Sequence, residues 1–162
     1  MSIEAVRCYL KQFEADKRII EFDVSSATVE LAAQVLGCPP ERIAKTLSFY
    51  GDEGCILIVT AGDAKIDNAK FKKQFGRKAK MLTFDDVEIL TGHPVGGVCP
   101  FAVNPGAVVY IDCSLKRFST VFPACGSSNS AIELTCDELV LFSHSKGWID
   151  VCKEWNNSNG GK

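Results

Sequence analysis

The 162-residue sequence lacks several features that mark large classes of protein. It contains no CxxC pair, so the common zinc and dithiol redox motifs are absent. No run approaches the ~20 apolar residues of a membrane span, and the first residues, MSIEAVRCYLKQF, contain no uninterrupted apolar stretch of signal-peptide type. We therefore expect a cytoplasmic protein that contacts no membrane and uses no metal or other cofactor.

Neither sign of charge predominates, since 18 Lys and Arg face 20 Asp and Glu, for a net charge of −2. This balance excludes a general attraction to nucleic acid. Hydrophobic residues at 46% and charged residues at 23% are typical of a globular protein, and the sequence shows no internal repeat or linker. We expect one domain over residues 1–155, followed by a disordered tail, NNSNGGK, over residues 156–162.

The eight cysteines are scattered along the chain and do not form a disulfide or ligand pattern. In a reducing compartment most of them are best interpreted as small buried hydrophobic residues. Their positions are 8, 38, 55, 99, 113, 125, 136 and 152.

Hydrophobic spacing and turn residues predict a series of short helices and strands. Their irregular order indicates an α+β fold, a single domain with a mixed, barrel-like β-sheet surrounded by short helices. The predicted helices cover residues 2–14, 27–36, 67–75, 83–90 and 136–142, and the predicted strands cover 18–24, 44–50, 55–61, 79–82, 107–112, 119–123 and 131–134.

The segment 92–102, GHPVGGVCPFA, has a density of glycine and proline that ordinary loops rarely need. Gly96 and Gly97 allow positive φ and close approach of a ligand, while Pro100 restricts φ and removes one donor. Such a loop can present backbone N–H groups to an oxyanion or a carbonyl oxygen. A tight structural turn explains the same residues equally well.

Lys45 stands at the start of a predicted strand among apolar residues. An ammonium group near apolar walls attracts phosphate or carboxylate strongly, because the local dielectric is low. The alternative is a lysine that extends its charged end into solvent.

A third motif, CGSSNS at 125–130, places short polar side chains beside a predicted strand. Gly126 permits a turn, and Ser127 and Asn129 could contact a small ligand. Glycine, serine and asparagine are also the expected residues of a plain turn.

A basic segment follows the predicted hairpin, with Lys65 just before it. Such a cluster could contact a few phosphates, or it could be a solvated helix face. Its residues are Lys70, Lys72, Lys73, Arg77, Lys78 and Lys80.

Together these motifs resemble the YbaK-like aminoacyl-tRNA deacylases, relatives of the editing domain of bacterial prolyl-tRNA synthetases. The resemblance rests on IAKTL at 43–47, GHPVGGVCPF at 92–101 with VVYID at 108–112, and ACGSSNSAIEL at 124–134. It implies hydrolysis of the ester of a mischarged tRNA in trans, chiefly proline tRNA. It also implies transient contact with an aminoacyl-tRNA synthetase.

The resemblance assigns roles by position. Lys45 anchors the terminal adenosine or its phosphate, and the loop of Gly96, Gly97, Val98, Cys99 and Pro100 directs backbone amides at the ester carbonyl. Gly126, Ser127 and Asn129 border the pocket for the amino acid, and His93 lies close enough to touch substrate, although a structural role suits it better. The basic segment contacts tRNA.

Water is then the attacking group, since the motifs supply no histidine or carboxylate as an obvious general base. Some family members carry an aspartate where this chain has Ala131. Some also carry an aromatic residue near the start of the region that here holds Ile20 and Phe22. The amino acid removed therefore stays open among alanine, cysteine, 2-aminobutyrate, serine and threonine.

Two other classes of function fit the sequence. One is a noncatalytic module that binds a tRNA end or a synthetase and regulates it. The other is a thiol enzyme that uses Cys99 or Cys125, each near a glycine turn that could lower the thiol pKa.

Overall fold

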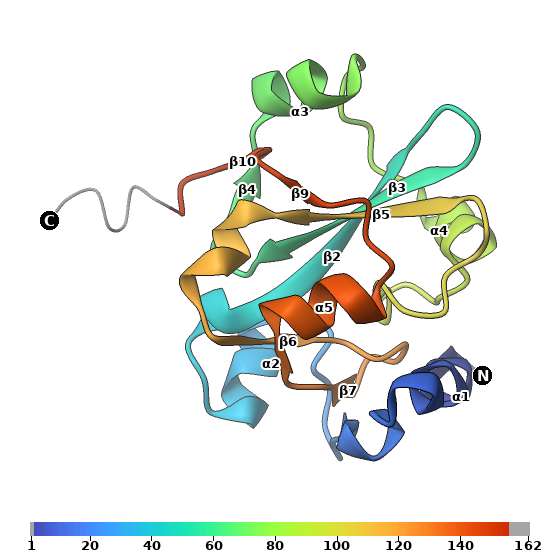
Figure 1. The fold of residues 1–162 in the computed structure, drawn as a ribbon, viewed down its shortest axis with the longest axis vertical. Coiled ribbons are helices and arrows are strands. Elements are labelled where there is room, and N and C mark those ends of the chain that lie inside the picture. Colours follow the sequence, from blue (N-terminus) through green and yellow to red (C-terminus); the bar gives the residue numbers. More distant parts are fainter. Residues whose placement is uncertain (1, 156–162) are drawn as a thin grey trace, which may run out of the picture.

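The computed structural model describes residues 2–155, and the predicted tail lies outside them. A curled, mixed sheet of six strands forms the centre, in the order β8-β6-β2-β3-β5-β9 (Figure 1). Strands β2 and β3 form the predicted antiparallel hairpin, while β6 and β5 extend it on either side in parallel. The strands are β2 Ile43–Tyr50, β3 Cys55–Ala61, β5 Ala107–Asp112, β6 Thr120–Pro123, β8 Leu134–Thr135 and β9 Trp148–Ile149.

Two pairs of very short strands fasten the outer segments. Strand β1 (Ile20–Glu21) pairs with β7 (Ser130–Ala131), and β4 (Lys65–Ile66) pairs with β10 (Cys152–Lys153), both antiparallel. With the central sheet curled into a half-barrel, the predicted α+β class and mixed barrel-like sheet are confirmed.

Five α-helices in the described chain cover the sheet, with α3 and α2 toward opposite ends of the molecule (Figure 1). Side chains cap three of them: Thr28 accepts from the Leu31 N–H, Asp67 accepts from the Lys70 N–H, and Thr135 forms a capping box with Glu138. The helices are α1 Ser2–Leu10, α2 Val29–Leu36, α3 Asn68–Phe75, α4 Phe84–Thr91 and α5 Cys136–Phe142; 3₁₀ turns cover Lys11–Phe13, Asp16–Arg18, Pro40–Arg42 and Cys113–Arg117.

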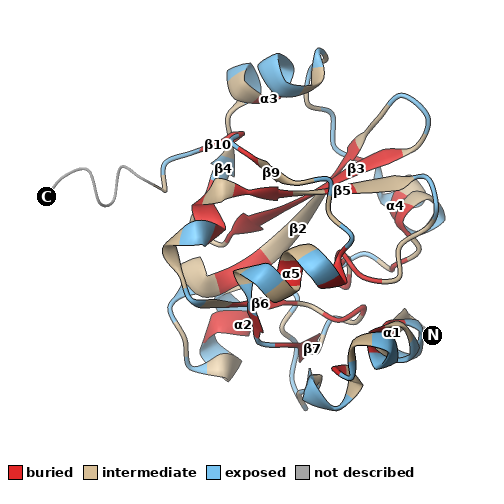
Figure 2. Cartoon of the chain, viewed as in Figure 1, coloured by how far each residue is buried: buried red, intermediate tan, exposed pale blue. Residues whose placement is uncertain are grey.

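Strand β3 lies at the centre of the core, and all seven of its residues are buried (Figure 2). It reads as a continuous apolar run because neighbouring strands and helices cover both of its faces. None of the five α-helices is long and apolar enough to cross a membrane, within residues 2–155.

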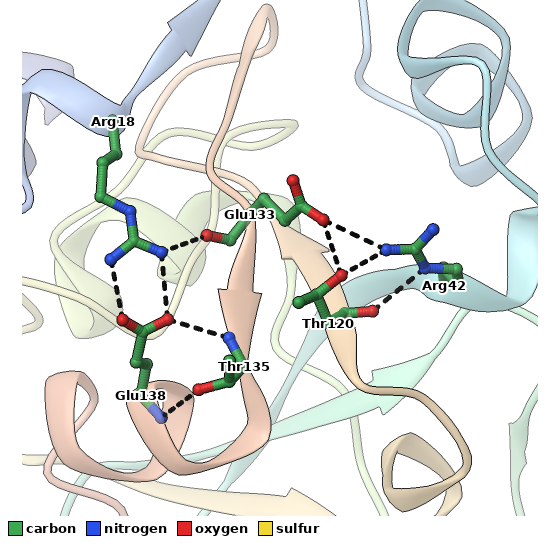
Figure 3. Close-up of polar contacts among 6 residues, drawn as sticks. All are labelled: Arg18, Arg42, Thr120, Glu133, Thr135 and Glu138. Carbon is green, nitrogen blue, oxygen red and sulfur yellow. Dashed lines mark hydrogen bonds and ion pairs between the residues drawn. The ribbon is translucent and has the colours of Figure 1, made fainter.

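Polar contacts hold the β6–β8 edge of the sheet (Figure 3). Arg18 donates to both carboxylate oxygens of Glu138, at 2.8 and 3.0 Å, and to the Glu133 carbonyl oxygen. Arg42 donates to the Thr120 carbonyl oxygen and pairs with Glu133 at 3.3 Å. These contacts join β6, β8 and α5 to two 3₁₀ turns from the first third of the chain.

Most predicted elements are present, but three predicted strands are wrong in extent. Of residues 18–24 only Ile20–Glu21 pair, because a 3₁₀ turn occupies Asp16–Arg18. Residues 79–82 contribute a single bridge at Met81, and residues 131–134 divide between β7 and β8. The two-residue strands β4, β9 and β10 were not predicted, since two residues are too few for a periodic pattern.

The expectation that most cysteines are buried is met by four of the eight. Cys8 is exposed on α1, and Cys38, Cys113 and Cys136 are partly exposed, whereas the other four are buried. All eight are free thiols.

Candidate functional site

A cavity of about 340 Å³ opens beside β2, between the start of α2, the glycine-rich loop and the segment that follows β6. Its walls are mainly apolar, with polar groups from β2, from the segment just before α2 and from Ser130. The residues that line it are Ser26, Ala27, Thr28, Val29, Ala32, Ile43, Ala44, Lys45, Thr46, Leu47, Ser48, Val87, Val95, Gly96, Val98, Phe122, Ala124, Ser130 and Ala131.

Lys45 brings a half-buried ammonium group to this cavity. Its Nζ donates to the Gly62 carbonyl oxygen at 3.3 Å, which leaves two of its three N–H groups without a partner among the described residues. Burial lowers the pKa of Lys45, and the positive charge of Lys65 adds to this, while Asp63 and Glu30 oppose it. A partly dehydrated cation with spare donors is well suited to bind an anion.

The next residue, Thr46, carries a hydroxyl that is buried and has no hydrogen-bond partner in the described part of the chain. A buried polar atom without a partner costs free energy, so native proteins rarely retain one without a reason. Ser48 and Ser130, both nearly fully buried, supply further hydroxyls to the cavity. The sequence interpretation missed these three residues, although Thr46 adjoins Lys45 and Ser130 ends the CGSSNS motif.

The glycine-rich loop forms a tight turn at the cavity mouth. The Gly97 N–H donates to the Pro94 carbonyl oxygen at 3.0 Å, and Gly96 has a φ of 89°, which favours glycine. The Gly97 amide is therefore used inside the turn, contrary to its predicted role toward the carbonyl of the substrate. Gly96 and Val98 line the cavity, and no acceptor for their N–H groups is found in residues 2–155.

The other predicted loop residues, Cys99 and Pro100, are buried and do not line the cavity. Pro100 instead borders a separate hollow near Tyr9 and His144.

The two predicted loops pack directly against each other, although about 30 residues separate them in the sequence. A Cβ atom added to Gly97 would lie 2.9 Å from backbone atoms of Gly126 and Ser127. Only a residue without a side chain permits this approach. The second loop thus supports the first from behind.

Hydrogen bonds inside the second loop occupy the polar groups that were predicted to contact substrate. Ser127 Oγ donates to Asn129 Oδ1 at 2.9 Å and, with its single proton so used, accepts from Ser130 Oγ at 2.7 Å. Asn129 Nδ2 donates to the Phe22 carbonyl oxygen at 2.9 Å. Gly126, Ser127 and Asn129 do not line the cavity. In this structure these three residues lie behind the cavity wall and support it.

His93 lies in the core with none of its surface exposed. Its Nε2 is 2.6 Å from the Phe101 carbonyl oxygen, so Nε2 must carry the proton, and Nδ1 accepts from Ser2 Oγ. Burial lowers the pKa of His93, so the ring stays neutral. With no exposed surface and both ring nitrogens engaged, His93 has the surroundings of a structural residue.

The same geometry argues against a thiol enzyme. Cys99 Sγ lies 3.5 Å from His93 Nε2, but that nitrogen already donates to a carbonyl and cannot take the thiol proton. Burial raises the pKa of Cys99 to about 12 and raises that of Cys125 well above its usual value. Neither thiol is placed to act as a nucleophile.

The predicted basic segment divides into two groups with different surroundings. Lys70 is held by Asp150 at 3.0 Å, and Arg77 is held by Asp52 at 2.6 Å, so both are engaged within the protein. Lys72 and Lys73 are exposed on α3. Lys78 and Lys80 lie beyond α3, where the Lys80 ammonium group is 5.4 Å from the centre of the Tyr50 ring.

One cluster of possible metal ligands occurs in the described residues, formed by Asp112, Cys113 and Asp150. Both carboxylate oxygens of Asp112 accept backbone N–H groups at 2.9 Å, and Asp150 pairs with Lys70. These groups are already used to close β5 onto the β9–β10 segment.

Comparisons with known proteins identify relatives of this sequence and of its fold. A family model described as the aminoacyl-tRNA editing domain matches residues 23–142. The uncharacterized protein YwhH of Bacillus subtilis (strain 168) is 57% identical over 156 residues, which cover 96% of this chain and 99% of that protein. A crystal structure of a candidate trans-editing enzyme for prolyl tRNA synthetase superimposes with a TM-score of 0.85 at 27% identity, covering 94% of this chain and 98% of the other.

The similarity extends to part of a much larger enzyme. The proline–tRNA ligase of Thermotoga sp. (strain RQ2) is 32% identical over 78 residues, which are 48% of this chain but only 14% of the ligase.

Proposed function

Because this chain belongs to the aminoacyl-tRNA editing domain family, we propose that it is a trans-editing deacylase. It hydrolyses the ester of a mischarged tRNA, namely proline tRNA that carries a small noncognate amino acid. The similarity to proline–tRNA ligases and to the candidate trans-editing enzyme supports this choice of tRNA.

The observation that carries the proposal is the position of Lys45 and the glycine-rich turn in the walls of one cavity. Lys45 binds the phosphate or ribose of the terminal adenosine with its spare donors. The N–H groups of Gly96 and Val98 face the ester carbonyl and stabilise its developing negative charge. These two amides replace the longer array that the sequence suggested.

The reaction needs little more than this, because an aminoacyl ester is already activated. A water molecule attacks the carbonyl carbon, with the ribose hydroxyl of the substrate assisting. The bond from that carbon to the tRNA 3′ oxygen breaks, and the 3′ oxygen takes up the proton that the water gives up. Each preorganised donor to an oxyanion is worth about 10²- to 10³-fold in rate. The hydroxyls of Thr46, Ser48 and Ser130 add polar contacts for the amino acid or the attacking water.

The cavity also bears on which amino acid is removed. Its volume of about 340 Å³ must hold a ribose and an aminoacyl group, and its apolar lining includes Val29, Ile43 and Phe122. Shape discrimination over one methylene yields only ~1 to 3 kcal/mol. We therefore keep alanine, cysteine, 2-aminobutyrate, serine and threonine as candidates.

The test is hydrolysis of proline tRNA charged separately with each of these amino acids and with proline, by wild type, Lys45→Ala and Lys45→Arg. We expect selective release of one noncognate amino acid by wild type and a loss of at least ~100-fold in Lys45→Ala, with partial recovery in Lys45→Arg. Circular dichroism checks that the variants are folded. Tight binding of tRNA without release of any amino acid would favour the noncatalytic binding module instead.

A further inference from the structure

Two lysines face each other across the small sheet of β4 and β10. Lys65 and Lys153 are register partners, and both are exposed. Like charges directly opposite each other in an antiparallel pair are destabilising. Within the described chain, the one ion-pair partner of these two lysines is Glu154, whose carboxylate is 3.7 Å from Lys65 Nζ. Two positive charges thus face a single paired carboxylate.

This lysine pair lies next to the Lys45 end of the cavity. Lys45 Nζ bonds to the Gly62 carbonyl oxygen, and a turn closed by the Ala64 N–H to the Ala61 carbonyl oxygen leads from there into β4. The lowered pKa of Lys45, caused first by burial, also reflects the charge of Lys65.

The other side of the small sheet is fastened to α3. The Lys70 ammonium group donates to the Cys152 carbonyl oxygen at 3.0 Å, and the Asp67 N–H donates to the Val151 carbonyl oxygen at 2.8 Å. Figure 1 shows β4 and β10 between α3 and the end of β3. The small sheet therefore connects the cavity to the basic helix.

The nearby carboxylates are mostly engaged. Asp63 forms a two-point contact with Arg117, at 2.6 and 3.0 Å, and Asp150 pairs with Lys70. Lys72 and Lys73 form no ion pair among the described residues. Asp67, whose carboxylate lies near Lys153, accepts the Lys70 N–H as the N-cap of α3. The small sheet and the adjoining α3 therefore carry the exposed cations Lys65, Lys153, Lys72 and Lys73, while Asp63, Asp67 and Asp150 have partners within the protein.

We propose that Lys65 and Lys153 bind the phosphate backbone of the nucleic acid strand whose 3′ end enters the Lys45 cavity. They continue the contact to Lys72 and Lys73 on α3. This inference rests on the proposed function, because it takes the strand to be the acceptor end of a tRNA. The proposed tRNA contacts thus include two lysines outside the basic segment of the sequence. They leave out Lys70 and Arg77, because Asp150 and Asp52 hold those side chains.

The experiment measures binding of uncharged proline tRNA by fluorescence anisotropy at several KCl concentrations. Each phosphate contact contributes about 0.7 to 0.9 to the slope of log affinity against log salt concentration. We expect the double variant Lys65→Ala/Lys153→Ala to reduce that slope by about 1 to 2 and Lys65→Arg/Lys153→Arg to retain it. The matched control is Lys11→Ala/Lys17→Ala, which removes the same charge from exposed residues near α1 and should leave the slope unchanged.

A wild-type slope in the folded Lys65→Ala/Lys153→Ala protein would overturn the proposal and leave this pair for another partner, such as an acidic protein surface. Equal losses in both alanine pairs would also overturn it, because net charge alone would then explain the effect. Failure of the proposed function is recognised separately: wild type would release no amino acid from charged tRNA, whatever the slopes are.

Discussion

The cavity beside Lys45 and the buried cluster around His93 both contain side chains that can take part in chemistry. They differ in whether those side chains already have hydrogen-bond partners. In the cavity, Lys45 has spare donors and the Thr46 hydroxyl has no partner among the described residues. In the cluster, His93 uses both ring nitrogens on Phe101 and Ser2. A site is marked by unmet hydrogen-bonding capacity beside open space.

Burial acts in opposite ways in the two regions. In the cluster it raises the pKa of Cys99 to about 12 and lowers that of His93, so both groups are neutral and inert. At the cavity it lowers the pKa of Lys45, but Asp63 and Glu30 counteract this. Desolvation thus keeps the groups of the His93 cluster uncharged, whereas at the cavity it leaves Lys45 a poorly hydrated cation that can bind an anion.

The largest effect on stability is expected from His93→Ala. The substitution leaves a void and removes the partner of the Phe101 carbonyl oxygen, so we expect a loss of about 3 kcal/mol in the free energy of unfolding. The exposed His144→Ala should lose less than about 1 kcal/mol. Urea unfolding at pH 7 measures both; similar losses would mean that the cluster is no more rigid than the surface.

The pH dependence of His93 has a definite sign. Its folded pKa lies below the unfolded value of about 6.5, so the unfolded chain binds a proton first as the pH falls. Wild type should lose stability below about pH 6.5, and His93→Ala should lack this part of the loss.

Gly97→Ala tests whether the two loops must touch. The new Cβ would lie 2.9 Å from backbone atoms of Gly126 and Ser127, so we expect a loss of about 2 kcal/mol in stability together with reduced deacylation. Gly106→Ala is the matched control, since its Cβ would have no contact closer than 3.7 Å and its φ is not in the left-handed region. If both variants behave alike, the close approach has no energetic consequence.

Thr46→Val separates function from stability at the cavity wall. The hydroxyl has no partner in residues 2–155, so its replacement should stabilise the protein by up to about 1 kcal/mol while deacylation falls. Thr91→Val should destabilise the protein, because the Thr91 hydroxyl donates to the Val87 carbonyl oxygen and accepts from the His93 N–H. Thermal unfolding and a deacylation assay measure the pair; a destabilised Thr46→Val protein would contradict the interpretation.

The smallest effect concerns the sheet edge, which lies outside both regions. The hydrogen bond from Arg18 lowers the pKa of Glu138 to about 2, so the stabilisation is present above the unfolded pKa of about 4.5 and is lost as the pH falls through about 2. Because the pair is partly exposed, we expect Glu138→Gln to cost only about 0.5 to 1 kcal/mol at pH 7. The difference from wild type should vanish near pH 2, as acid unfolding would report; a constant difference would exclude the ion pair as its cause.

Much of the architecture could be predicted from the sequence because the signals are local. The hairpin of β2 and β3, the helices predicted over 27–36 and 67–75, and strand β5 follow from runs of several residues. Strands of two residues, such as β4 and β10, carry no such signal. They form only because distant segments supply their hydrogen-bond partners.

For the candidate site, the sequence by itself determined the motifs: Lys45, the glycine-rich loop and the CGSSNS loop, with the family resemblance that they carry. Only the tertiary structure decided which of their groups face the cavity. It turned Asn129, Cys99 and His93 toward partners inside the protein and left Lys45 beside open space. The physical reason is that chain-local chemistry sets turns and caps, whereas burial and the choice of hydrogen-bond partners depend on segments that meet only after the chain has folded.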